Sequence, residues 1–262
     1  MNLPTDRALL LSSIAQYVYK NENGVITNSR PLFGKDIGLL KWAPTEGGSP
    51  LDMWMNDNVI GYFMAEYDLR DKANQRSSSR KPTKFLDSFF LERLLLGGRY
   101  SHGNVRRWTK RQSLSKFDKV FIPVNIRNAH WALIVVRMSA KTVSYYDSMN
   151  GDGSAYFDAI LRYLEDESKG DPALDKEPWT FDRLKWKCLN VKTPQQTNGY
   201  DCGIFVIQLA DLLSLDIPLL FGQADMAIVR RRLLSSIFDR VSDPAGDRFC
   251  NVAGVLDIDE DD

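Results

Sequence analysis

Residues 199–213 read GYDCGIFVIQLADLL and pass without a break from a polar, glycine-containing turn into an apolar run. Gly203 to Leu213 is apolar on most of a helix circumference, which predicts a buried helix. Cys202 stands directly before this helix, where backbone N–H groups and the positive end of the helix dipole favour a thiolate. Polar and glycine residues surround Cys202, so a catalytic nucleophile fits this position better than a small buried hydrophobe does.

The other two cysteines give no comparable signal. Cys188 lies in Trp-Lys-Cys-Leu and fits a small buried hydrophobe, and Cys250 is assigned no role. Three cysteines at positions 188, 202 and 250 match neither a disulfide framework nor the paired spacing of a zinc site. This pattern indicates a reducing compartment.

A general base has to come from only two histidines. His102 lies in the polar, turn-like stretch Tyr-Ser-His-Gly-Asn, which is typical of a surface histidine. His130 directly precedes the apolar run Trp131–Val136, so a titratable ring is expected at the end of a buried strand. The pattern alone also fits a purely structural histidine.

Asp147 ends the next predicted strand, Thr142–Tyr146. If the two strands form an antiparallel hairpin with its tip at 138–141, His130 and Asp147 lie at the same edge. A carboxylate there can accept the imidazole Nδ1–H, fix the tautomer and stabilise the imidazolium. An ordinary solvated aspartate at a strand end is the alternative reading of the pattern.

Gln195 and Gln196 follow Pro194, shortly before Cys202. A side-chain amide close to the Cys202 backbone N–H would form an oxyanion hole for attack of a thiolate on a carbonyl. Glutamines in loops are commonly just solvated, so the spacing alone is a weak signal.

The fold class predicted from these patterns is α+β: a single domain with a small mixed central sheet flanked by helices. With 262 residues and 44% hydrophobic composition, the chain can build one sizeable core. We expect a helical N-terminal extension (1–40) packed on a main domain (41–250), followed by an acidic, disordered tail (251–262). Within the main domain the predicted helices are Trp54–Tyr67, Phe85–Leu96, one capped by Ser154, Gly203–Leu213 and Ala224–Val241; the strands are Val120–Val124, Trp131–Val136, Thr142–Tyr146 and one in Leu184–Val191; the loops are 41–51 and 70–84.

The charge balance argues against two classes of partner. Basic and acidic residues number 34 each, so nothing favours nucleic acid or an anionic membrane as the main partner. The longest apolar run near the start, Ala8–Leu11, is too short for a signal peptide or a membrane span. A monomer is expected.

Several ordered segments resemble the sentrin (SUMO)-specific, ubiquitin-like-protein protease family of the clan CE cysteine peptidases. The resemblance runs from about residue 51 to 238 and rests on PQQTNGYDCGIFV (194–206), HWAL (130–133), YDS (146–148), WMND (54–57) and RRW (106–108). Residues 1–40, the loop 41–51 and the basic segment 70–84 depart from the family pattern.

The resemblance implies a clan CE fold with the nucleophile at the N-terminus of a buried helix. It implies His130, Asp147 and Cys202 as catalytic residues and Gln196, six residues before the cysteine, as the oxyanion residue. By the same resemblance, Trp54 and Trp131 cover the Gly-Gly tail of the substrate, and Asp57 helps to hold the bound modifier. No metal or cofactor is implied, and the location is intracellular: nucleus or cytoplasm, or a host cell for a bacterial effector.

The implied activity is that of a thiol isopeptidase or endopeptidase that cleaves after the C-terminal Gly-Gly of a ubiquitin-like modifier. SUMO and its lysine-linked conjugates are the first expectation, in deconjugation or precursor processing. Alternatives with the same fold are a NEDD8- or ubiquitin-directed protease and a clan CE acetyltransferase. Asp147 favours the protease, because the acetyltransferases typically carry Glu there. An inactive modifier-binding module is the third alternative, and the intact His, Asp, Gln and Cys positions argue against it.

Overall fold

The computed structural model describes residues 32, 34–41, 49–75, 81–109 and 112–242. Most of the expected N-terminal extension (1–40), most of the loop 41–51, Cys250 and the acidic tail lie outside these ranges. The chain divides into two compact units. One, the sheet unit, comprises Asp71–Gln195, and the other, the helical unit, comprises the residues up to Arg70 and from Gln196 onward.

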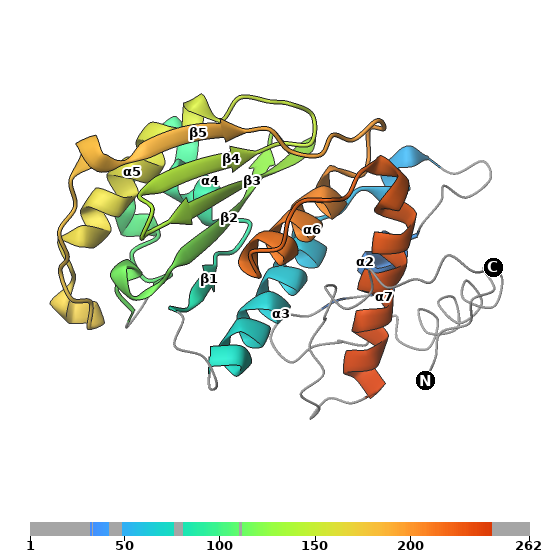
Figure 1. Cartoon of the computed structure of the whole chain (residues 1–262), viewed down its shortest axis with the longest axis horizontal. Helices are drawn as coiled ribbons and strands as arrows, with labels where there is room; N and C mark the ends of the chain where they lie inside the picture. Colours follow the sequence, from blue (N-terminus) through green and yellow to red (C-terminus); the bar gives the residue numbers. More distant parts are fainter. Residues whose placement is uncertain (1–31, 33, 42–48, 76–80, 110–111, 243–262) are drawn as a thin grey trace. The chain divides into compact units, whose positions relative to one another are not determined.

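A five-stranded mixed sheet forms the core of the sheet unit, with the strands in the order β1-β2-β3-β4-β5 (Figure 1). The pairs β1–β2 and β4–β5 are parallel, and the pairs β2–β3 and β3–β4 are antiparallel. The sheet confirms the predicted α+β class. Its strands are β1 (Thr83–Phe85), β2 (Lys119–Ile126), β3 (His130–Arg137), β4 (Thr142–Tyr146) and β5 (Lys187–Val191).

The predicted hairpin of β3 and β4 is confirmed. Arg137 pairs with Thr142, which leaves residues 138–141 as the tip, and Leu133 pairs with Tyr146 at the other end. Apart from end residues, all residues of the two strands are buried. This burial fixes the register of the pair, because a slip by one residue would turn the core-facing side chains to the other face of the sheet. The hairpin therefore carries the start of β3 and the end of β4 to one edge.

Pro123 lies inside β2, where it pairs with Leu133 of β3. The parallel neighbour β1 pairs with β2 only as far as Phe121. Proline lacks the N–H that a second neighbour would need, so its position just past the end of β1 is compatible with the sheet.

The helices of the sheet unit are α4 (Phe90–Leu94) and α5 (Ser154–Ser168). The predicted helix over Phe85–Leu96 is wrong in its first part, because Phe85 ends β1 and stacks on Phe121 with ring centroids 4.8 Å apart. A short apolar run does not distinguish a strand from a helix, which explains the error.

Ser154 does not cap α5 as predicted. Ser154 is the first residue of the helix, and the Oδ1 of Asp152 accepts hydrogen bonds from its N–H at 2.9 Å and from its Oγ at 2.6 Å. The strand expected within Leu184–Val191 starts only at Lys187, because a 3-10 helix occupies Arg183–Lys185.

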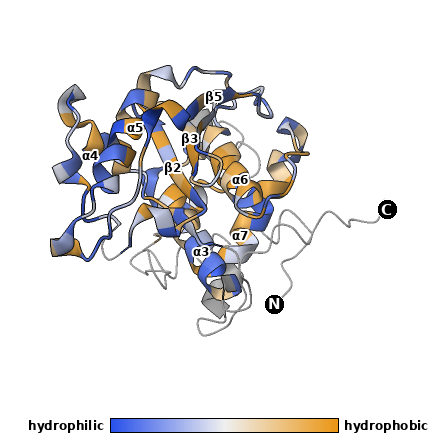
Figure 2. Cartoon of the chain, turned by 60° about the vertical axis from the view of Figure 1, so that its left-hand side comes forward, coloured by the Kyte–Doolittle hydropathy of each residue, from blue (hydrophilic) through white to orange (hydrophobic). Residues whose placement is uncertain are grey.

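The helical unit contains α2 (Gly34–Gly38), the 3-10 helix η1 (Pro50–Met53), α3 (Asp57–Gln75) as far as Arg70, α6 (Cys202–Ser214) and α7 (Met226–Ser242). Every residue of α6 is buried, as predicted, and Figure 2 shows this helix almost wholly in the hydrophobic colour. The inward face of α7 is formed by four buried residues, Met226, Val229, Leu233 and Ile237.

α3 runs from Asp57 to Gln75 and so starts later and ends later than predicted. It starts after Asn56 because the Oδ1 of that residue accepts the Val59 N–H at 3.1 Å, as an N-cap does. Its last turns include Arg70, which is buried in an ion pair with Asp211 and donates to the Ser214 hydroxyl at 2.7 Å. The expected exposed connection over 70–84 is therefore wrong at both of its ends.

Candidate active site

The β3–β4 hairpin brings His130 and Asp147 into direct contact. His130 is the first residue of β3, Asp147 follows the last residue of β4, and the His130 Nε2 lies 2.7 Å from the Asp147 Oδ1. The sequence prediction had assigned Nδ1 to this contact, whereas the structure uses Nε2. Nδ1 is therefore the ring nitrogen on the side away from the carboxylate.

Asp147 is held in its ionised form by several donors. Its side chain is 3% exposed, and it accepts the Met149 N–H at 2.7 Å and the Tyr145 hydroxyl at 3.1 Å in addition to His130. Burial raises the pKa of Asp147, but the hydrogen bonds from His130, Met149 and Tyr145 outweigh it, so the pKa lies below its ordinary value. A fixed carboxylate can orient the imidazole and stabilise its protonated form.

Gly151 leaves the room that the Asp147 carboxylate occupies. A Cβ on Gly151 would collide with the Asp147 Oδ2 and would lie 3.2 Å from its Cγ. Nothing in the sequence around Gly151 indicated this close approach. Gly151 and Tyr145 are thus site residues that sequence reasoning missed.

Gln195 stabilises the loop that contains Asp147. Its Nε2 donates to the Asp147 carbonyl oxygen and to the Thr193 carbonyl oxygen, both at 3.0 Å. Gln195 is therefore held by backbone of the sheet unit and ties the Asp147 loop to residue Thr193.

Cys202 is the first residue of α6 in the helical unit and is 5% exposed. The turn before it is organised by Asn198, whose Oδ1 accepts the N–H groups of Tyr200 at 3.2 Å and Asp201 at 3.1 Å. Gln196 lies in this turn, and its Nε2 donates to the Asn198 carbonyl oxygen at 2.6 Å. The predicted place of the cysteine, at the N-terminus of a buried helix, is confirmed.

The three residues expected to meet the substrate are also divided between the units. Trp54 lies half-buried between η1 and α3, and Asp57 is the first residue of α3, also half-buried. Trp131 follows His130 in β3 and is 5% exposed. The sheet unit thus holds His130, Asp147 and Trp131, and the helical unit holds Cys202, Gln196, Trp54 and Asp57.

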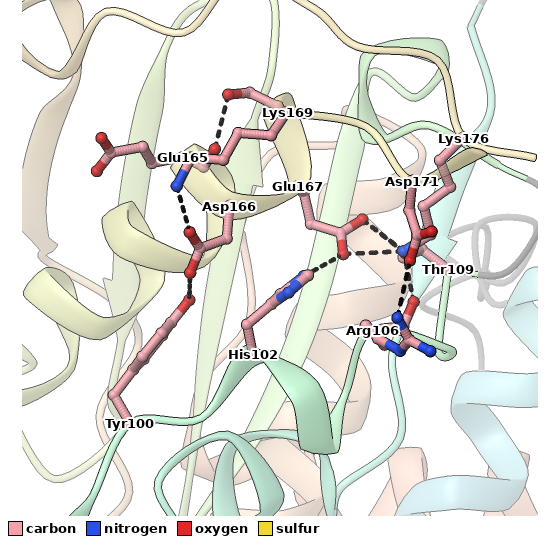
Figure 3. Close-up of polar contacts among 11 residues, drawn as sticks. Tyr100, His102, Arg106, Thr109, Glu165, Asp166, Glu167, Lys169, Asp171 and Lys176 are labelled. Carbon is pink, nitrogen blue, oxygen red and sulfur yellow. Dashed lines mark hydrogen bonds and ion pairs between the residues drawn. The ribbon is translucent and has the colours of Figure 1, made fainter. Parts of the chain in front are cut away.

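His102 is not the surface histidine that its sequence context predicted. Its Nε2 lies 2.7 Å from the Oε1 of Glu167, a buried carboxylate that also accepts Thr109 Oγ1 at 2.8 Å and Lys176 Nζ at 2.9 Å (Figure 3). Burial raises the pKa of Glu167, but these hydrogen bonds outweigh it and lower the pKa. The cluster joins α5 to the loops before and after it, so His102 has a structural role.

Cys188 lies in a different environment from Cys202. Cys188 is half-buried in β5, and burial raises the pKa of its thiol, which disfavours the thiolate. Among the described residues, no group of three or more His, Cys, Asp or Glu side chains could hold a metal ion. No helix within the same ranges is long and apolar enough to cross a membrane.

Comparison with known proteins gives consistent matches over most of the chain. Residues 53–245 match the Ulp1 protease family, C-terminal catalytic domain. Sentrin-specific protease 2 of Rattus norvegicus is 34% identical over 187 residues, which cover 70% of this chain and 30% of that protein. Ubiquitin-like-specific protease 1 of Saccharomyces cerevisiae is 35% identical over 184 residues, covering 68% and 26%.

The fold has a solved counterpart. The C-terminal Ulp1 protease domain in complex with Smt3, the yeast ortholog of SUMO, aligns with a TM-score of 0.67 and 28% identity. The alignment covers 92% of this chain and 99% of that one. The chain spans less than a third of the length of these curated relatives. Because the match to the catalytic domain takes in α3, the whole sheet, α6 and α7, the chain belongs to the Ulp1 protease family.

Proposed function

We propose that this chain is a thiol protease that cleaves after the C-terminal Gly-Gly of a ubiquitin-like modifier, with SUMO as the preferred modifier. The observation that carries the proposal is the 2.7 Å contact between His130 and Asp147, in a chain of the Ulp1 family whose α6 begins at a cysteine. A histidine fixed by an ionised carboxylate is what activation of a cysteine requires.

The reaction starts with transfer of the Cys202 thiol proton to His130 Nδ1, while Asp147 holds Nε2. The thiolate attacks the carbonyl carbon of the last glycine, and the amide of Gln196 and the Cys202 N–H stabilise the oxyanion. His130 then protonates the leaving lysine amine as the C–N bond breaks, which leaves a thioester. His130 next deprotonates a water, which hydrolyses the thioester and regenerates the thiol. No metal or organic cofactor is needed.

Selectivity for the Gly-Gly tail is assigned to Trp54 and Trp131. Two indole rings over a narrow channel admit residues without a Cβ and reject larger ones. Asp57, half-buried at the start of α3, is proposed to hold a basic group of the modifier by charge pairing. The choice of SUMO is supported by the names of the relatives and by the Smt3 complex.

The decisive test is hydrolysis of a SUMO–fluorophore conjugate by the wild-type chain and by Cys202→Ala. We expect turnover by the wild type and none by the variant, and activity that survives in the variant would refute the assignment. Parallel reactions with NEDD8 and ubiquitin conjugates rank the modifiers. Turnover of acetyl-CoA without cleavage would instead support an acetyltransferase, and SUMO binding without any reaction would support an inactive module.

A further inference from the structure

Arg230 is a fully buried cation next to the proposed nucleophile. It lies in α7, is 1% exposed, and donates to the Asp201 Oδ1 through Nη2 at 2.6 Å and through Nε at 2.9 Å. Asp201 directly precedes Cys202 and is itself 3% exposed. Burying a charge is costly unless it is paired and fully hydrogen-bonded, so this pair needs an explanation.

The same guanidinium also donates hydrogen bonds to backbone carbonyl oxygens in three segments of the helical unit. Its acceptors are the carbonyl oxygens of Leu39 at 2.7 Å, Lys41 at 3.1 Å, Met53 at 3.1 Å and Tyr200 at 3.5 Å. Leu39 and Lys41 follow α2, Met53 is the last residue of η1, and Tyr200 lies in the turn before Cys202. One side chain thereby ties the nucleophile turn to the segment that leads into Trp54.

The second carboxylate oxygen of Asp201 also accepts hydrogen bonds. Its Oδ2 accepts the Asn198 Nδ2 and the Gln223 Nε2, each at 2.7 Å. With both oxygens occupied, the carboxylate has one orientation, and the backbone that leads into Cys202 is fixed with it. This backbone includes the Cys202 N–H that is proposed to face the oxyanion.

We propose that Arg230 is the positioning residue of the nucleophile: it neutralises the Asp201 carboxylate beside Cys202 and fixes the turn that presents the Cys202 thiol and N–H. The inference rests on the proposed function of Cys202. It adds a cation from α7 to the proposed site residues that the helical unit holds.

The electrostatic reason is the position of the carboxylate. A buried negative charge one residue before Cys202 opposes formation of a second negative charge, and an ion-paired arginine cancels that opposition. Burial lowers the pKa of the Arg230 guanidinium, whereas Asp201, Tyr200 and Cys202 raise it. Because this attraction is mutual, Arg230 favours the thiolate.

The test is the pH dependence of Cys202 alkylation by iodoacetamide, read by mass spectrometry on the peptide that contains Cys202. Removing the cation in Arg230→Gln leaves Asp201 uncompensated, and we expect the alkylation midpoint to rise by about one pH unit. Removing the anion in Asp201→Asn leaves the cation, and we expect the midpoint to fall. His130, the other charged group assigned to act on the thiol, is unchanged in both variants.

The double variant Asp201→Asn/Arg230→Gln guards against misfolding, because it buries no unpaired charge. Its midpoint is expected to return to within a few tenths of a unit of the wild type. Arg230→Lys keeps the positive charge but loses the planar set of guanidinium N–H donors. We expect its alkylation midpoint to equal that of the wild type. We expect its kcat for SUMO–fluorophore to fall more than tenfold at unchanged KM, because the turn is no longer held in place.

Shifts of opposite sign in the two single variants support the proposal, since a pair that only stabilises the fold would not produce them. Shifts of the same sign, or no shift, overturn it. Failure of the proposed function has a different signature: Cys202→Ala retains cleavage activity, whatever the alkylation midpoints show.

Discussion

At the scale of single residues, the contact between His130 and Asp147 decides what the site can do. Asp147 contacts Nε2 of the ring, which leaves Nδ1 as the nitrogen proposed to act as the base. In Asp147→Asn, the ring loses its charged acceptor while the geometry stays nearly the same. We expect kcat for SUMO–fluorophore to fall roughly 10²–10⁴-fold with little change in KM. Steady-state kinetics within threefold of the wild type would contradict the role assigned to Asp147.

Gly151 gives a second prediction at this scale. In Gly151→Ala the new Cβ meets the Asp147 carboxylate, which has to move away from His130. A displacement of about 1 Å at a catalytic group costs on the order of 100-fold in kcat/KM. Gly103→Ala is the matched control, because a Cβ there finds only the Ser101 Oγ at 3.8 Å. Equal activity of the two variants would show that Gly151 does not protect the carboxylate.

At the scale of elements, the start of α3 depends on Asn56. Its Oδ1 caps the helix, and its Nδ2 donates to the buried Asp36 at 2.7 Å. In Asn56→Ala we expect the free energy of unfolding to fall by about 1–2 kcal/mol, the range of a lost N-cap. Urea denaturation measures this change, and a midpoint equal to that of the wild type would exclude the cap as a stabilising contact.

Some helices and strands could be predicted from the sequence alone, and others could not. The β3–β4 hairpin and α6 were predicted within one residue, because long runs of β-branched or uniformly apolar residues admit one arrangement. The three residues of β1 are too few for a periodicity, and their pairing with β2 joins positions 36 residues apart. The sequence did not reveal the end of α3, because Arg70 looks like a solvated loop residue. It is buried by pairing with Asp211, which is far away in the sequence.

At the scale of the whole molecule, the residues proposed to be catalytic are distributed over the two units. Local pairing within one hairpin joins His130 to Asp147, and this much follows from the sequence pattern. Cys202 belongs to the helical unit, and its position directly before an apolar helix already indicated a nucleophile. Gln196, Trp54 and Asp57 belong to the same unit, and their assignments came from the family resemblance. The contacts of Gly151 and Arg230 arise only in the folded chain and leave no local pattern.

Acid stability is a property of the whole chain to which the site contributes. The pKa values of Asp147 and Glu167 are lowered from ordinary values of 3.8 and 4.5. The stability they contribute is present above those values and is lost as the pH falls through the folded pKa. We expect the free energy of unfolding to drop as the pH falls below about 4.5, with a shallower drop in Asp147→Asn. Identical slopes in urea titrations at successive pH values would contradict this.

The most direct test of the central claim is reaction of the chain with SUMO that carries a C-terminal electrophile. The proposed chemistry predicts one covalent adduct, located by mass spectrometry at Cys202, absent in Cys202→Ala and retained in Cys188→Ser. An adduct at Cys188 or Cys250, or no adduct with a folded wild-type chain, would contradict the claim.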